Sequence, residues 1–152
     1  MKSLYDNYIF DFDGTIVDLQ IDWDNFRTVI NSHCQKHKIP KTMPLPKKII
    51  ELGKISSKFL DLVYLLEVNN GNPNYKIIEK IAYFIDSLDQ QIFIISNNHS
   101  KTIRDILIRE KLLKNCKLII GIDKVMTPKP NHEPFKYIKS LIKNGKSLYI
   151  GD

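Results

Sequence analysis

Residues 8–15 read Tyr8-Ile9-Phe10-Asp11-Phe12-Asp13-Gly14-Thr15, an apolar run that ends at two acidic residues and a glycine. Three apolar residues in a row predict a short buried strand. Gly14 predicts a tight turn directly after that strand. The segment therefore places two carboxylic acids, Asp11 and Asp13, at the carboxyl end of a strand.

Strands and helices alternate from residue 72 onward. Asn72-Pro73 predicts a helix start, and an apolar face of helical spacing continues from there to Leu88. Apolar runs predict strands over 91–95, 118–120 and 147–150, with helices over 99–113 and 134–142 between them. This order predicts an α/β fold in which parallel strands are joined by right-handed crossovers.

Residues 19–70 interrupt that alternation. Apolar residues over 23–30 recur at helical spacing, and shorter helical stretches follow over 49–52 and 59–66. Three prolines, Pro40, Pro44 and Pro46, break the chain between the first two stretches. We interpret residues 19–70 as a helical cap inserted into an α/β core made of residues 1–18 and 71–152.

Polar residues follow all four predicted strands of the core. They are Asp11 with Asp13, Ser96 with Asn97, the region of Lys129-Pro130, and Gly151-Asp152. Ligands of open α/β sheets bind beyond the carboxyl ends of the strands. We therefore expect these residues to gather at one edge of the sheet, although they are scattered along the chain.

This set of residues suits phosphoryl transfer, which depends on positioning and on neutralising charge. A carboxylate such as Asp11 can attack phosphorus, and Asp13 can act as the general acid and base. Lys129 offers a compact positive charge. Asp11 and Asp152 can supply the hard oxygen ligands that Mg²⁺ prefers. Gly14 permits a turn whose N–H groups face a phosphate, and Ser96 could hold another phosphate oxygen.

Four segments, in this order, are similar to the motifs of the haloacid dehalogenase-like (HAD) phosphatases. The run Asp11-Phe12-Asp13-Gly14-Thr15 resembles motif I, and Ile94-Ile95-Ser96-Asn97 resembles motif II. Lys129-Pro130 with Glu133-Pro134-Phe135 resembles motif III, and Tyr149-Ile150-Gly151-Asp152 resembles the opening of motif IV. The resemblance covers nearly the whole chain. It extends to the phosphoglycolate-phosphatase-like branch with a small helical cap.

The resemblance implies a Rossmann-like parallel sheet of strand order 4-1-2-3, truncated after strand 4. It implies a Mg²⁺-dependent enzyme with Asp11 as nucleophile, Asp13 as acid and base, and Lys129 as the neutralising cation. The metal would be held by the carboxylates of Asp11 and Asp152 and by the backbone carbonyl of Asp13. The phosphate would be bound by Phe12, Gly14, Thr15, Ser96, Asn97 and Lys129.

We expect the substrate to be a small phosphorylated metabolite, and the resemblance points to one similar to phosphoglycolate. Nothing follows Asp152, whereas motif IV of the family continues to a second acidic residue. A catalytically impaired phosphate-binding or interaction module is therefore an alternative, and a phosphomutase is another. His99 and His132 lie near the same edge, and we interpret them as solvated loop or helix-cap residues.

Bulk composition excludes several classes of protein. The net charge is +6, but lysines are spread along the whole chain and no nucleic-acid motif accompanies them. No apolar run is long enough to cross a bilayer, and the N-terminus lacks the pattern of a secretory signal. We expect a cytoplasmic protein without nucleic-acid or membrane partners, as a monomer or weak dimer. A calcium-binding loop at 11–22 is disfavoured, because Asp22 stands at the twelfth position, where such loops carry Glu.

Overall fold

A parallel sheet forms the centre of the molecule. The computed structural model describes residues 4–69, 71–142 and 145–151. Four strands, β1 (Asn7–Phe10), β4 (Gln91–Ile95), β5 (Cys116–Ile120) and β6 (Ser147–Ile150), pair in the order β5-β4-β1-β6. All three pairings are parallel. Numbered along the chain, these four strands confirm the predicted order 4-1-2-3.

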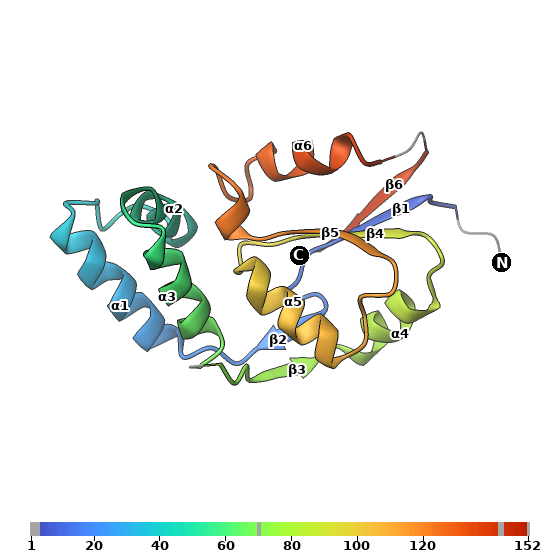
Figure 1. Cartoon of the computed structure of the whole chain (residues 1–152), viewed down its shortest axis with the longest axis horizontal. Coiled ribbons are helices and arrows are strands. Elements are labelled where there is room, and N and C mark those ends of the chain that lie inside the picture. The colour runs from blue at the N-terminus through green and yellow to red at the C-terminus, as the bar shows by residue number, and fades with distance from the viewer. Residues whose placement is uncertain (1–3, 70, 143–144, 152) are drawn as a thin grey trace.

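Helices cover both faces of this sheet (Figure 1). On one face, α4 (Glu79–Ser87) and α5 (Ser100–Arg109) pack over side chains such as Phe10, Ile92 and Ile94. On the other face, α6 (Glu133–Lys139) packs over Phe93 and Ile95. Alternate residues of a strand point to opposite faces. The continuous apolar strands in the sequence therefore reflect burial on both sides.

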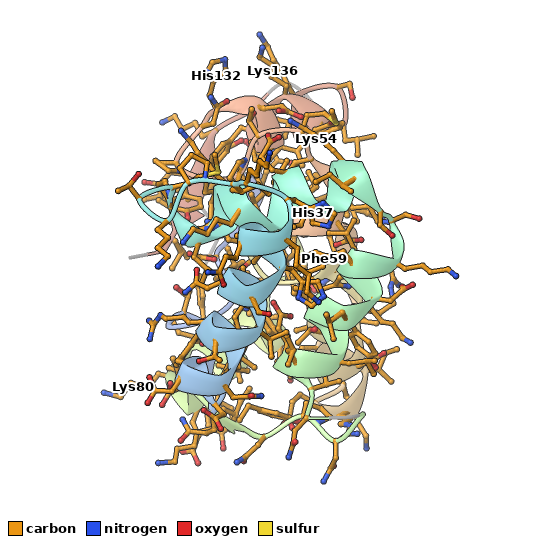
Figure 2. All side chains as sticks on the ribbon, turned by 90° about the vertical axis from the view of Figure 1, so that its left-hand side faces the viewer. His37, Lys54, Phe59, Lys80, His132 and Lys136 are labelled. Atoms are coloured by element: carbon orange, nitrogen blue, oxygen red, sulfur yellow. The ribbon has the colours of Figure 1, made fainter. Side chains whose placement is uncertain are left out.

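Three helices form a separate layer beyond the carboxyl ends of the strands (Figure 1). They are α1 (Trp23–Lys36), α2 (Leu45–Ile55) and α3 (Lys58–Glu67), and they share a core that includes Phe26, Ile30 and Phe59. Figure 2 shows Phe59 between α1 and α3, while His132 and Lys136 project outward from the region of α6. Pro46 lies in the first turn of α2, where the missing N–H costs little. It therefore starts this helix rather than breaking the chain.

The sequence did not predict the antiparallel ribbon that joins the helical layer to the sheet. Strand β2 (Val17–Leu19) pairs with β3 (Tyr75–Ile77) in the register Val17↔Ile77 and Leu19↔Tyr75. The expectation that a helix starts at Asn72-Pro73 was wrong, because α4 begins only at Glu79. Residues 75–77 instead pair with a strand that is distant in sequence, which a local pattern cannot reveal. The helices predicted to end at 113 and 142 end at Arg109 and Lys139.

The ends of the sheet strands are level, so the residues that follow them meet. Phe10 pairs with Ile94 on one side and with Ile150 on the other. Asp11, Ser96 and Gly151 therefore come close to the same edge, facing the helical layer. Within the described residues, no helix is both long enough and apolar enough to cross a membrane.

Candidate active site

Asp11 is a buried carboxylate held by a cation. It directly follows β1 and is only 7% exposed. Its Oδ2 lies 2.5 Å from Lys129 Nζ, and its Oδ1 accepts a hydrogen bond from the N–H of Phe12 at 2.7 Å. A buried carboxylate is costly unless it is paired and hydrogen-bonded. Lys129 therefore supplies the partner that the buried Asp11 carboxylate needs at the end of the strand.

Asp13 lies in a tight loop between β1 and β2. Gly14 adopts φ +78°, and the carbonyl of Phe12 accepts from the N–H of Ile16 at 2.8 Å. This turn directs the Oδ1 of Asp13 to the N–H of Leu19, at 2.8 Å. Burial raises the pKa of Asp13, and the negative charges of Asp18 and Asp11 raise it further despite the Leu19 hydrogen bond. The shift favours the protonated form that a general acid needs.

Asn97 fixes the backbone of Lys129. Its Nδ2 donates to the carbonyl of Lys129 at 3.2 Å, and its Oδ1 accepts from the N–H of the same residue at 2.9 Å. The Lys129 side chain then spans from Asp11 to Tyr149, whose hydroxyl lies 3.4 Å from Nζ. The predicted phosphate-binding residue Asn97 thus also orients the cation. Asn97 and Lys129 are 32 residues apart, so no local sequence pattern predicts these hydrogen bonds.

Ser96 belongs to a buried polar cluster with Asn98. The Ser96 hydroxyl donates to Asn98 Oδ1 at 2.8 Å, and the N–H of Asn98 donates to Ser96 Oγ at 3.3 Å. His99 follows and caps α5, with its Nδ1 accepting from the N–H of Lys101. His99 is therefore a helix-cap residue as predicted, but it is buried rather than solvated, whereas His132 is exposed.

Glu67 is a site residue that sequence reasoning missed, as it missed Asn98 beside it. It ends α3 in the helical layer and is only 5% exposed. Its two carboxylate oxygens accept from the N–H of His99 at 3.2 and 3.0 Å, and Oε1 also lies 3.4 Å from Asn98 Nδ2. Burial raises the pKa of Glu67 to about 7. The only signal in the sequence was an acidic residue at the end of an apolar helical run.

These residues enclose a pocket of about 200 Å³ between the sheet edge and the helical layer. It is lined by Asp11, Asp13, Trp23, Phe26, Leu45, Pro46, Ile49, Glu67, Ser96, Asn97, Asn98 and Lys129. Five of the predicted site residues, namely Asp11, Asp13, Ser96, Asn97 and Lys129, therefore come together. The pocket is smaller than a typical ligand pocket of about 300–1,000 Å³, which indicates a small ligand.

Three predicted phosphate-binding residues do not line this pocket. Phe12 and Thr15 are buried, and the N–H of Gly14 donates to the carbonyl of Val17 at 2.7 Å. Gly14 therefore acts as a turn former in this structure. A role for these three residues in phosphate binding stays a prediction. The predicted metal ligand Asp152 lies outside the described residues.

The donor set of the pocket fits a magnesium ion. Asp11 contributes a carboxylate to the pocket, and Mg²⁺ is usually bound by one or two carboxylates while it keeps several waters. Over residues 4–69, 71–142 and 145–151, no group of three or more His, Cys, Asp or Glu side chains is arranged to hold a metal. The described residues thus offer the carboxylate of Asp11 at this edge, and the backbone carbonyl of Asp13 and the carboxylate of Asp152 remain the other predicted ligands.

Comparisons with known proteins agree with this geometry. A family model described as haloacid dehalogenase-like hydrolase matches residues 8–152. A search of curated protein sequences gave no match. Among solved structures, a protein from Lactobacillus plantarum assigned as a phosphoglycolate phosphatase shares 16% identity with a TM-score of 0.61. That alignment covers 99% of this chain and 78% of the other.

Two further solved structures have the same fold. A protein from Clostridium acetobutylicum, predicted to be a phosphatase, shares 20% identity with a TM-score of 0.61, over 99% of this chain and 77% of the other. A magnesium-bound protein from Bacillus subtilis, assigned as a HAD hydrolase, shares 20% identity with a TM-score of 0.54. Its alignment covers 99% of this chain and 81% of the other. At these identities the likeness concerns the fold.

Proposed function

Because the chain belongs to the haloacid dehalogenase-like hydrolases, we propose that it hydrolyses a small phosphomonoester, with Asp11 as nucleophile and Mg²⁺ as cofactor. One observation carries this proposal. The Asp11 carboxylate is buried beside Lys129 Nζ at 2.5 Å, and Asp13, with a raised pKa, lines the same pocket. A charge-neutralised nucleophile beside a carboxylic acid is what phosphoester cleavage requires.

In the first step, a carboxylate oxygen of Asp11 attacks phosphorus and the bond from phosphorus to the ester oxygen breaks. The leaving oxygen takes the electron pair of that bond and a proton from Asp13, so that an alcohol departs and Asp13 becomes ionised. Lys129 offsets the negative charge that nucleophile and phosphate bring together. Ser96 and Asn97, which line the pocket, would bind phosphate oxygens.

In the second step, Asp13 accepts a proton from water as the water oxygen attacks the phosphorus of the aspartyl-phosphate. The bond from phosphorus to Asp11 breaks, which releases inorganic phosphate and restores the Asp11 carboxylate. Asp13 regains its proton, so the cycle is balanced. The same residue thus serves as acid and then as base, which a pKa displaced toward neutral pH favours.

Asp11, Asp13 and Asp152 are the residues that would hold magnesium. When bound, the ion would supply positive charge that reduces repulsion between the carboxylate nucleophile and the phosphate. The Asp11 carboxylate in the pocket supports this assignment, and so does the magnesium bound to the Bacillus subtilis protein of the same fold.

The test is release of inorganic phosphate from p-nitrophenyl phosphate and a panel of small phosphomonoesters, with Mg²⁺ or with a chelator. We expect metal-dependent release that Asp11→Asn abolishes and Asp13→Asn reduces at least about 100-fold, the lower range for general acid–base catalysis. Asp86→Asn is the matched control, because Asp86 is exposed on α4 and away from the pocket. If folded protein releases no phosphate from any substrate but still binds phosphate, the non-catalytic phosphate-binding module is the correct reading.

A further inference from the structure

The helical layer presents an almost entirely apolar wall to the pocket. It contributes Trp23, Phe26, Leu45, Pro46 and Ile49, together with one polar side chain, Glu67. Phe26 and Ile49 are buried, whereas Trp23, Leu45 and Pro46 are partly exposed. The polar residues of the pocket come mainly from the sheet edge. The end of a substrate that points away from the phosphate would therefore meet apolar side chains.

Positive charge is scarce in this pocket. Of its described lining residues, Lys129 alone is cationic, and it is paired with Asp11 at 2.5 Å. A neighbouring pocket of about 430 Å³ shares Asp11, Asn97 and Lys129 and is completed by Pro130, Phe135 and Tyr149, which add no cation. Asp11, Asp13 and Glu67 bring three carboxyl groups. A second anionic group on the substrate would therefore find repulsion or desolvation instead of a partner.

Nearby basic residues and Glu67 are already engaged elsewhere. The guanidinium carbon of Arg27 lies 5.7 Å from the centre of the Trp23 ring. Arg27 is exposed and does not line the pocket. Lys48 Nζ donates to Asn31 Oδ1 and to the carbonyl of Lys41, at 2.9 and 2.8 Å. Glu67 accepts from the N–H of His99 with both oxygens. Lys48 and Glu67 therefore offer no free charge to a ligand, and Arg27 lies outside the lining of the pocket.

We propose that the substrate is a phosphomonoester whose organic group is small, apolar and free of a second negative charge. This inference rests on the proposed function and narrows it away from phosphoglycolate, which carries a carboxylate. The pocket of about 200 Å³ beside the apolar wall accommodates a small organic group. The wall formed by Trp23, Leu45 and Pro46 determines its polarity.

The experiment compares isobutyl phosphate with phosphoglycolate, since the isopropyl end of the first has the shape of the carboxylate of the second. We expect kcat/KM for isobutyl phosphate to be at least tenfold higher. The comparison is stringent, because the electron-withdrawing carboxyl group makes glycolate the better leaving group. Equal rates, or a preference for phosphoglycolate, would overturn the proposal.

Variants of the wall test its cause. Leu45→Arg adds a cation at a partly exposed wall position and is expected to raise relative activity on phosphoglycolate at least tenfold. Leu45→Met keeps the position apolar and should leave the preference unchanged. Arg27→Gln should also leave it unchanged. A selective loss of phosphoglycolate turnover in Arg27→Gln would mean that Arg27 reaches the substrate, and it would contradict the proposal.

Failure of catalysis and failure of this inference can be told apart. If no ester is hydrolysed, the proposed function fails, and calorimetric titration of the unmodified protein with the same two esters still tests the pocket. Tighter binding of isobutyl phosphate would support the apolar specificity. Equal binding, tighter binding of phosphoglycolate, or no binding of either would refute it.

Discussion

Replacing Glu67 by glutamine tests the most unusual contact between the helical layer and the sheet. The substitution keeps the size of the side chain and an oxygen that can accept from the N–H of His99. It removes the acid that burial shifts from its ordinary pKa of 4.5 to about 7. Stability measured against pH therefore separates the effect of the charge from that of the contact.

The magnitude follows from linkage between proton binding and folding. Below pH 4.5, Glu67 is protonated in both the native and the unfolded state, so its ionisation costs nothing. Between pH 4.5 and about 7, the unfolded chain has released the proton and the native state has not, so native stability falls as pH rises. Above that window the loss is complete, at about 3 kcal/mol for a pKa difference of this size.

The assay is urea unfolding of both proteins at pH values from 4.5 to 8. We expect the free energy of unfolding of Glu67→Gln to rise relative to the unmodified protein by about 3 kcal/mol across this range. A change in hydrogen bonding would add an offset of about 1–3 kcal/mol that does not vary with pH. Glu79→Gln, at the exposed first position of α4, is the control; it loses only the interaction with the helix N-terminus and should change stability by less than about 1 kcal/mol. If the difference in free energy of unfolding between Glu67→Gln and the unmodified protein does not change with pH, the reasoning is refuted.

Three further predictions concern the sheet edge. Lys129→Met removes the cation 2.5 Å from Asp11 and should lower kcat about 10²–10³-fold, whereas an unchanged kcat in the phosphate-release assay would contradict this role. Asn97→Ala removes two hydrogen bonds to the Lys129 backbone. It should lower the free energy of unfolding, measured with denaturant, by about 1–3 kcal/mol, and it should lower kcat more than it changes KM. Asp123→Ala removes the acceptor of the Ser100 N–H and hydroxyl at the start of α5 and should cost about 1–2 kcal/mol at neutral pH. Burial would raise the pKa of Asp123, but the Ser100 hydrogen bonds and His99 lower it. The stability that Asp123 contributes should therefore be lost as the pH falls below about 4. Thermal unfolding of Asp123→Ala and of the unmodified protein at pH 7 and pH 3 measures this, and an equal stability difference at both pH values would contradict the prediction.

The sequence alone determined the sheet and the edge where its polar residues meet. Continuous apolar runs such as 8–10 and 91–95 are typical of strands in a parallel sheet that is buried on both faces. The polar residues that end those runs must then lie at its carboxyl edge. This is why Ser96, which lies far along the chain from Asp11 and Asp13, could be placed beside them from the sequence alone.

Only the tertiary structure decided how those residues are held. The ribbon of β2 and β3, the support of Lys129 by Asn97, and the contact of Glu67 with His99 all join segments that are distant in sequence. A local pattern reports propensity and burial, but it carries no record of which distant group satisfies a given hydrogen bond. The same limit applies to the pocket wall. The apolar residues of α1 and α2 predicted a helical core from the sequence, and only their packing against the sheet edge brought Leu45 to the pocket beside Trp23.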